Sequence, residues 1–87
     1  MDHFYTEAEL VEIFTKAAPC VGWPEWAIDC DNRIIRFTEY GRYTAFGWQV
    51  DHIRPVALGG IDAMTNLRPR HWQGNSFAGG LLGGLLG

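Results

Sequence analysis

The chain has 87 residues, of which 47% are apolar and 14% aromatic, and its formal net charge is −3. This composition is typical of one small globular domain and excludes a disordered chain, while two cysteines are too few for a disulfide framework or a four-cysteine zinc site. No apolar run approaches the roughly 20 residues of a membrane span, and no secretory signal opens the chain, so we expect a cytoplasmic protein without a membrane partner.

A helix is predicted near the N-terminus. Thr6 and Glu9 fit a capping box, and Tyr5 and Leu10 occupy the two positions of a hydrophobic staple. Apolar residues recur at helical spacing as far as Ala18, where a proline follows and ends the pattern. We expect this apolar stripe to lie in the core: Leu10, Val11, Ile13, Phe14, Ala17 and Ala18.

Three segments after this helix favour strands. Residues 26–37 contain β-branched and aromatic residues around a turn at Asp31-Asn32, which predicts a β-hairpin. Residues 46–52 alternate between aromatic or apolar and polar side chains, as in a strand. After a loop that contains Pro55 and Gly59-Gly60, residues 66–70 can pair back with that strand.

A second helix is predicted from about Trp72, and it would carry Asn75 and Phe77. Residues 79–87 contain only glycine and leucine, which predicts a frayed tail whose leucines partly cover the core; a close-packed helix face is the alternative. One α+β domain is therefore expected over residues 1–87. Its parts are an N-terminal helix and hairpin (1–45), a central region (46–78) and the tail (79–87).

Residues 51–75 contain the side chains best suited to chemistry. Asp51 and Asn75 offer oxygen ligands from two different elements, which suits Mg²⁺ or Mn²⁺. His52 can take a proton from water near neutral pH, but on a regular strand it points away from Asp51, so one shared site requires a bend. The arginines nearby can contact phosphate, and together these groups indicate metal-assisted phosphodiester hydrolysis.

The same stretch resembles the HNH endonuclease motif in its HNN form, with His52, Asn66 and Asn75 in the three signature positions. The chain is similar to the small stand-alone bacterial and phage HNH proteins over roughly residues 10–78. The residues that carry the resemblance are the run 47–56, Gly59-Gly60, Asn66-Leu67-Arg68-Pro69, Trp72 and Asn75, with Asp31, Ile35 and Tyr40-Gly41 upstream.

This resemblance implies a ββα-metal (His-Me finger) core, here extended by an N-terminal helix and hairpin. It implies a DNA endonuclease in which His52 is the general base and in which Asp51 and Asn75 bind one divalent metal ion. Mg²⁺ or Mn²⁺ is expected, with Zn²⁺ or Ni²⁺ as alternatives. Asn66 would hold the hairpin loop and so orient His52. One such site cuts one strand, so a double-strand cut would need a homodimer or two encounters.

Four other residues near the motif each allow a functional and a structural interpretation. His71 lies four positions before Asn75, so on one helix both could share a metal, although an ordinary histidine is the simpler interpretation. Arg54, Arg68 and Arg70 are candidates for nucleic-acid phosphate contacts or ordinary surface charges.

Two alternative functions remain open. The chain is acidic overall, and Ala78 stands where the family usually has lysine, which favours a catalytically inactive HNH-fold module that binds DNA or protein. A metal-bound structural domain whose tail docks a partner is the third hypothesis.

Overall fold

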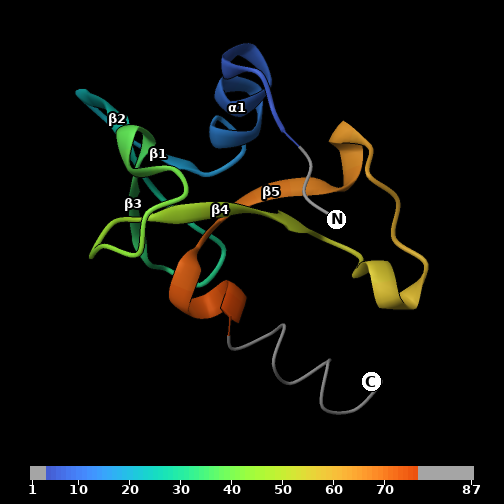
Figure 1. The fold of residues 1–87 in the computed structure, drawn as a ribbon. Coiled ribbons are helices and arrows are strands. Elements are labelled where there is room, and N and C mark those ends of the chain that lie inside the picture. The colour runs from blue at the N-terminus through green and yellow to red at the C-terminus, as the bar shows by residue number, and fades with distance from the viewer. Residues whose placement is uncertain (1–3, 77–87) are drawn as a thin grey trace.

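The computed structural model describes residues 4–76 of the chain, and its first element is helix α1 (Glu7–Phe14) (Figure 1). The predicted capping box is confirmed: the backbone N–H of Glu9 donates to the Thr6 side chain, and that of Thr6 donates to Glu9 Oε1. The predicted extension of this helix to Ala18 is wrong. The residue before a proline avoids the α-helical conformation, and residues 18–20 instead form a strand. The helix therefore buries only Ile13 and Phe14.

The first sheet is antiparallel and contains β1 (Ala18–Cys20), β2 (Trp23–Ile28) and β3 (Ile34–Arg36), in that order. The pair β2–β3 confirms the predicted hairpin. Asn32 in its turn has a φ of 62°, a left-handed conformation that asparagine tolerates better than most residues.

The second sheet is the antiparallel pair of β4 (Trp48–His52) and β5 (Leu67–His71), as predicted. Its register runs without a break from Trp48 opposite His71 to His52 opposite Leu67. Short 3-10 turns at Val56–Leu58 and Met64–Asn66 shape the connection between the strands. Residues 72–76 are helical and follow β5 directly.

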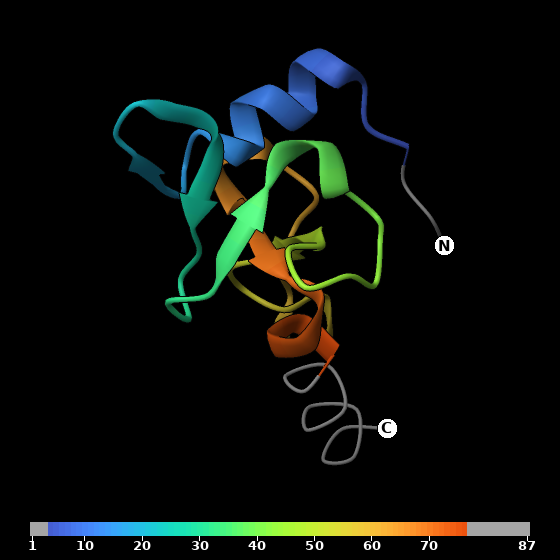
Figure 2. The same cartoon turned by 90° about the vertical axis from the view of Figure 1, so that its left-hand side faces the viewer.

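Trp48 is the centre of the core. It is fully buried, and its ring lies 5.3 Å from that of Phe14 and 4.9 Å from that of Tyr40 between ring centroids. Helix α1 covers the face of the β4–β5 pair on which Trp48 lies, and the three-stranded sheet lies beside this pair (Figure 2). The buried apolar residues are Ile13, Phe14, Ala27, Ile35, Trp48 and Leu67.

Asp29 joins the two sheets. Its side chain is buried after β2, where Oδ1 accepts hydrogen bonds from the backbone N–H groups of Asp31 and Arg33. Its Oδ2 accepts one from the backbone N–H of His71 in β5, at 2.8 Å. One carboxylate therefore fixes the β2–β3 turn and holds it against the second sheet.

The described residues form a small α+β domain with two antiparallel sheets. Within residues 4–76, no helix has the length and apolar character that crossing a membrane requires. Cys20 and Cys30 are both free thiols. The predictions for the tail and for Phe77 and Ala78 concern residues outside this range.

Candidate active site

The two faces of the β4–β5 pair carry different side chains. Trp48, Val50 and His52 alternate along β4 with Gln49 and Asp51, so the two sets leave opposite faces of the strand. The first set lies on the face that helix α1 covers. The pairing is regular as far as His52, so the bend that would turn Asp51 and His52 to one face is not present.

His52 is the last residue of β4 and faces a polar partner in the connecting loop. Its Nε2 lies 3.1 Å from Asp62 Oδ1. Both residues line an open cavity of about 830 Å³, to which the N-terminal segment contributes Phe4 and Tyr5.

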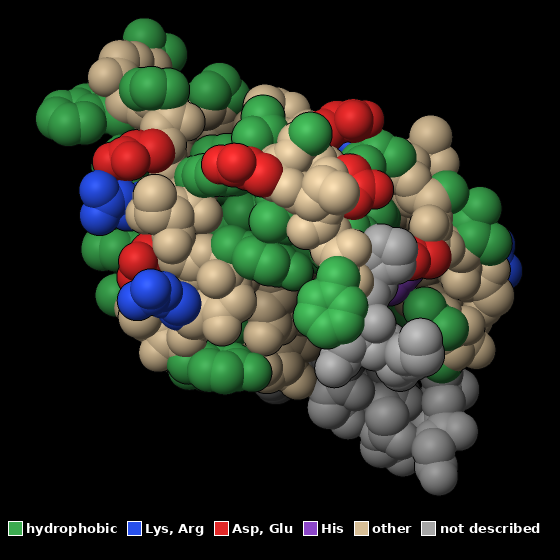
Figure 3. Space-filling model, turned by 45° about the horizontal axis from the view of Figure 1, so that its top comes forward, with side chains coloured by type: hydrophobic (Ala, Val, Ile, Leu, Met, Phe, Trp, Pro, Cys, Tyr) green, Lys and Arg blue, Asp and Glu red, His purple; other side chains and the backbone are tan. Residues whose placement is uncertain are grey.

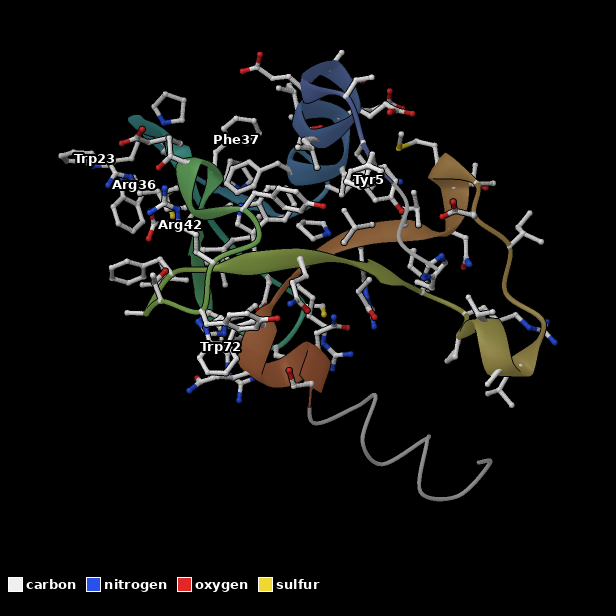
Figure 4. The ribbon with its side chains drawn as sticks, viewed as in Figure 1. Tyr5, Trp23, Arg36, Phe37, Arg42 and Trp72 are labelled. Atoms are coloured by element: carbon white, nitrogen blue, oxygen red, sulfur yellow. The ribbon has the colours of Figure 1, made fainter. Side chains whose placement is uncertain are left out.

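Tyr5 contributes to this cluster from the start of the chain. Its hydroxyl group donates to Asp62 Oδ1 at 3.2 Å. In Figure 4, Tyr5 lies between α1 and the β4–β5 connection, while Trp72 lies on the other side of the β4–β5 pair. Burial and the charge of Asp62 raise the pKa of Tyr5 to about 12, so its hydroxyl group remains a donor at neutral pH.

Asn66 stabilises the loop between β4 and β5 through hydrogen bonds to its backbone. Its Oδ1 accepts from the backbone N–H of Arg54 at 2.8 Å, and its Nδ2 donates to the carbonyl groups of Arg54 and Ile61. Its own carbonyl group accepts from the backbone N–H of Ile53 at 2.8 Å. Asn66 is thus bonded both to the residues after His52 and to the residue before Asp62.

Asp51 faces arginine on the opposite side of the β4–β5 pair. Arg68 stands directly across from it in β5 and donates from Nε to Asp51 Oδ2 at 2.7 Å. Arg70 Nη1 lies 3.6 Å from the same oxygen. The carboxylate is only 14% exposed, so these two guanidinium groups compensate a charge that is largely withdrawn from water.

Arg70 is shared between two carboxylates. It also binds Asp31 of the β2–β3 turn through Nε and Nη2, at 2.7 and 3.2 Å. The hydrogen bond from Arg70 holds the pKa of Asp31 below its usual value. Gly74 packs against this pair, and a Cβ atom at position 74 would collide with the Asp31 carboxylate.

Asn75 returns to β4 from the helical residues 72–76. Its Nδ2 donates to Gln49 Oε1 at 2.7 Å, on the face that also carries Asp51. A carboxylate and an amide oxygen on one face fit a hard divalent cation, and such a cation at Asp51 would have to replace the Arg68 contact.

Backbone groups occupy both ring nitrogens of His71. Nε2 lies 2.8 Å from the Ala45 carbonyl group, and the backbone N–H of Gln73 donates to Nδ1. The residue is buried in β5 and is not on one helix with Asn75, as a shared metal would require. These contacts favour a structural role.

The three candidate phosphate-binding arginines all have partners within the chain. Arg54 donates from Nε to the Leu58 carbonyl group at 2.7 Å, while Arg68 and Arg70 bind carboxylates as described above. A phosphate group would therefore compete with existing contacts at each position.

Neither Asp62 nor Tyr5 was predicted from the sequence to be functional, and Tyr5 was predicted only as one position of a hydrophobic staple. Asp62 lies after Gly59-Gly60 in the loop that connects β4 to β5. Because this loop begins at His52 and returns to the strand that pairs with β4, the sequence did indicate that a residue late in the loop can lie near His52. Tyr5 gave no such signal, because it lies 57 residues from Asp62 along the chain. Comparison with family models, curated proteins and solved structures finds no match to this chain.

Proposed function

We propose that this chain is a metal-dependent DNA endonuclease whose ββα-metal core consists of β4, β5 and the helical residues 72–76. The observation that carries the proposal is the bond between Asn75 and Gln49. It brings the last residue of the motif back to the strand that holds Asp51 and His52. The loop bonds of Asn66, next to His52, add support.

In this mechanism, His52 accepts a proton from the attacking water molecule. The water oxygen forms a bond to phosphorus, the bond to the 3′ oxygen breaks, and that oxygen takes up a proton from solvent water, which leaves 5′-phosphate and 3′-hydroxyl ends. Asp51 and Asn75 would hold the divalent ion, which when bound stabilises charge on the phosphate and on the leaving oxygen. Arg68 and Arg70 lie beside Asp51, where they could contact the substrate phosphates.

The position of His52 at the end of β4 matters for this mechanism. Asp51 and His52 leave opposite faces of the strand, so a phosphate bound over one face would meet only one of them. A phosphate at the end of the strand can be approached from both faces. We therefore place the scissile phosphate beside the last residue pair of the second sheet, His52 and Leu67.

Nicking of supercoiled plasmid tests the proposal. The protein is stripped with a chelator and then supplied with Mg²⁺, Mn²⁺, Zn²⁺ or Ni²⁺. We expect metal to restore nicking, and we expect His52→Ala to lower the rate by about 10²-fold or more without changing the affinity for Mn²⁺ measured by calorimetry. Gln73→Ala, an exposed change near the motif, serves as the control.

Failure of the folded wild-type protein to cut with any metal would overturn the proposal. Equal loss of Mn²⁺ affinity in His52→Ala would contradict the assigned role of the base.

A non-catalytic module that binds DNA or protein is the second candidate. One observation that favours it is that Arg54, Arg68 and Arg70 all have partners within the chain. A second is the set of acidic side chains around α1, which includes Glu7 and Glu9 (Figure 3). Salt-dependent DNA binding without metal-dependent cleavage would select this module.

A further inference from the structure

We infer that Asp62, supported by Tyr5, is the positioning residue of His52 and fixes which ring nitrogen receives the proton from water. The inference rests on the proposed function and names a carboxylate outside the motif residues considered so far. Three separate parts of the chain meet in this cluster: the end of β4, the loop before β5 and the segment before α1.

The contacts define the state of the ring. Asp62 Oδ1 lies 3.1 Å from Nε2 of His52, and a carboxylate accepts hydrogen bonds. The neutral ring therefore carries its proton on Nε2, which leaves the lone pair on Nδ1 to accept a proton. The bond also fixes the rotation of the ring about its connection to the backbone.

Tyr5 fixes the carboxylate in turn. Its hydroxyl group donates to the same oxygen, Asp62 Oδ1, so this oxygen has contacts with both Tyr5 and His52. Exposure of the Asp62 side chain is 42%, and a carboxylate this accessible to water benefits from a second donor that limits its rotation. Tyr5 thus acts on the base through Asp62.

Asn66 sets the distance between the two partners. It binds the carbonyl group of Ile61, directly before Asp62, and the backbone N–H groups of Ile53 and Arg54, directly after His52. The two sides of the His52–Asp62 pair are therefore tied to one residue. By these hydrogen bonds Asn66 keeps Asp62 within contact distance of His52.

Cleavage kinetics with three variants test the inference. Asp62→Asn keeps the size of the side chain but can donate to Nε2, which favours the wrong tautomer. We expect it to lower kcat by about 10- to 100-fold, a part of what a general base contributes, with KM for DNA unchanged. Asp62→Glu should recover part of this loss, and Tyr5→Phe should show a smaller loss. Glu12→Gln, on the exposed side of α1, removes the same charge and should behave as wild type.

A double variant separates positioning from an independent effect. Asp62→Asn should have no further effect in a His52→Ala background, because the ring that it positions is absent. An equal loss in both backgrounds would overturn the inference, as would a wild-type kcat in Asp62→Asn.

Nitrogen NMR of the ring gives a measurement that does not depend on cleavage. At a pH where His52 is neutral, we expect the wild type to show the Nε2–H tautomer and Asp62→Asn to lose it. His52→Ala identifies the signals. If the wild type fails to cut DNA, the proposed function fails, but the tautomer still decides whether Asp62 positions the ring; the Nδ1–H tautomer in the wild type would overturn the inference.

Discussion

At the scale of single residues, the side chain of Asn66 makes three hydrogen bonds to the backbone of the loop between β4 and β5. We expect Asn66→Ala to lower the free energy of unfolding by about 1–3 kcal/mol, because a hydrogen bond contributes about 0.5–1.5 kcal/mol. Urea denaturation measures the loss. Hydrogen exchange of the Arg54 amide should accelerate at the same time, since that N–H loses its acceptor. Unchanged exchange at Arg54 would contradict this role.

Arg68 and a metal ion compete for the same carboxylate. We expect Arg68→Gln to lower the Kd for Mn²⁺ by about 5-fold or more, because the ion then no longer competes with Arg68 for a carboxylate that is largely withdrawn from water. Calorimetry with the metal alone measures this change.

Arg33→Gln is the matched control for Arg68→Gln, because Arg33 pairs with Asp31 and not with Asp51 among the ion pairs of residues 4–76. An equal change in Kd for both variants would mean that overall charge, not competition at Asp51, controls the affinity.

At the scale of elements, the pair Asp31–Arg70 joins the β2–β3 turn to β5. The pKa of Asp31 in the folded protein lies below its ordinary value of 3.8, so the pair stabilises the fold above that pH. This stabilisation is lost as the pH falls through the lower folded pKa. We expect Asp31→Asn to lower the free energy of unfolding by up to about 1 kcal/mol at pH 7.

The difference between wild type and Asp31→Asn should shrink as the pH is lowered below 3.8 and through the folded-state pKa of Asp31, where the wild-type carboxylate also becomes neutral. Urea denaturation at several pH values measures it, with Glu12→Gln as the control. A difference that stays constant as the pH is lowered through the acid range would show that the charge of Asp31 is not the cause.

Local patterns predicted the elements whose causes are local. The capping box of α1, the β2–β3 hairpin and the pairing of β4 with β5 all follow from residues close together in sequence. The end of α1 was predicted wrongly, since Ala17 and Ala18 continue the apolar stripe while the following proline favours an extended chain. Strand β1 was missed because it contains a proline and only three residues.

The residues of the candidate site also fall into those that local sequence predicts and those that it does not. His52, Asn66 and Asn75 could be selected from one stretch of sequence, but their partners could not. Asp62 and Tyr5 meet only because the segment before α1 lies beside the loop between β4 and β5, and Arg70 meets Asp31 across 39 positions. Such pairs depend on the packing of the two sheets, which no local pattern encodes.

At the scale of the whole molecule, one tryptophan connects α1 with the second sheet. We expect Trp48→Ala to lower the free energy of unfolding by about 3–5 kcal/mol, which is most of the stability of a domain this small. Trp23→Ala is the control, because that side chain is 66% exposed. Circular dichroism and thermal denaturation measure both variants.

Trp48→Phe keeps an aromatic ring and should fold with a lower Tm. Equal losses for Trp48→Ala and Trp23→Ala would show that burial at the centre of the core does not determine stability.

The contact between Tyr5 and Asp62 has a practical consequence for work on this protein. Phe4 and Tyr5 line the same cavity as His52, so the first described residues of the chain lie beside the proposed base. An affinity tag or fusion partner at the N-terminus would be joined about three residues before Phe4, close enough to the proposed site to interfere with a test of activity. Recombinant protein should therefore be assayed after removal of any N-terminal tag.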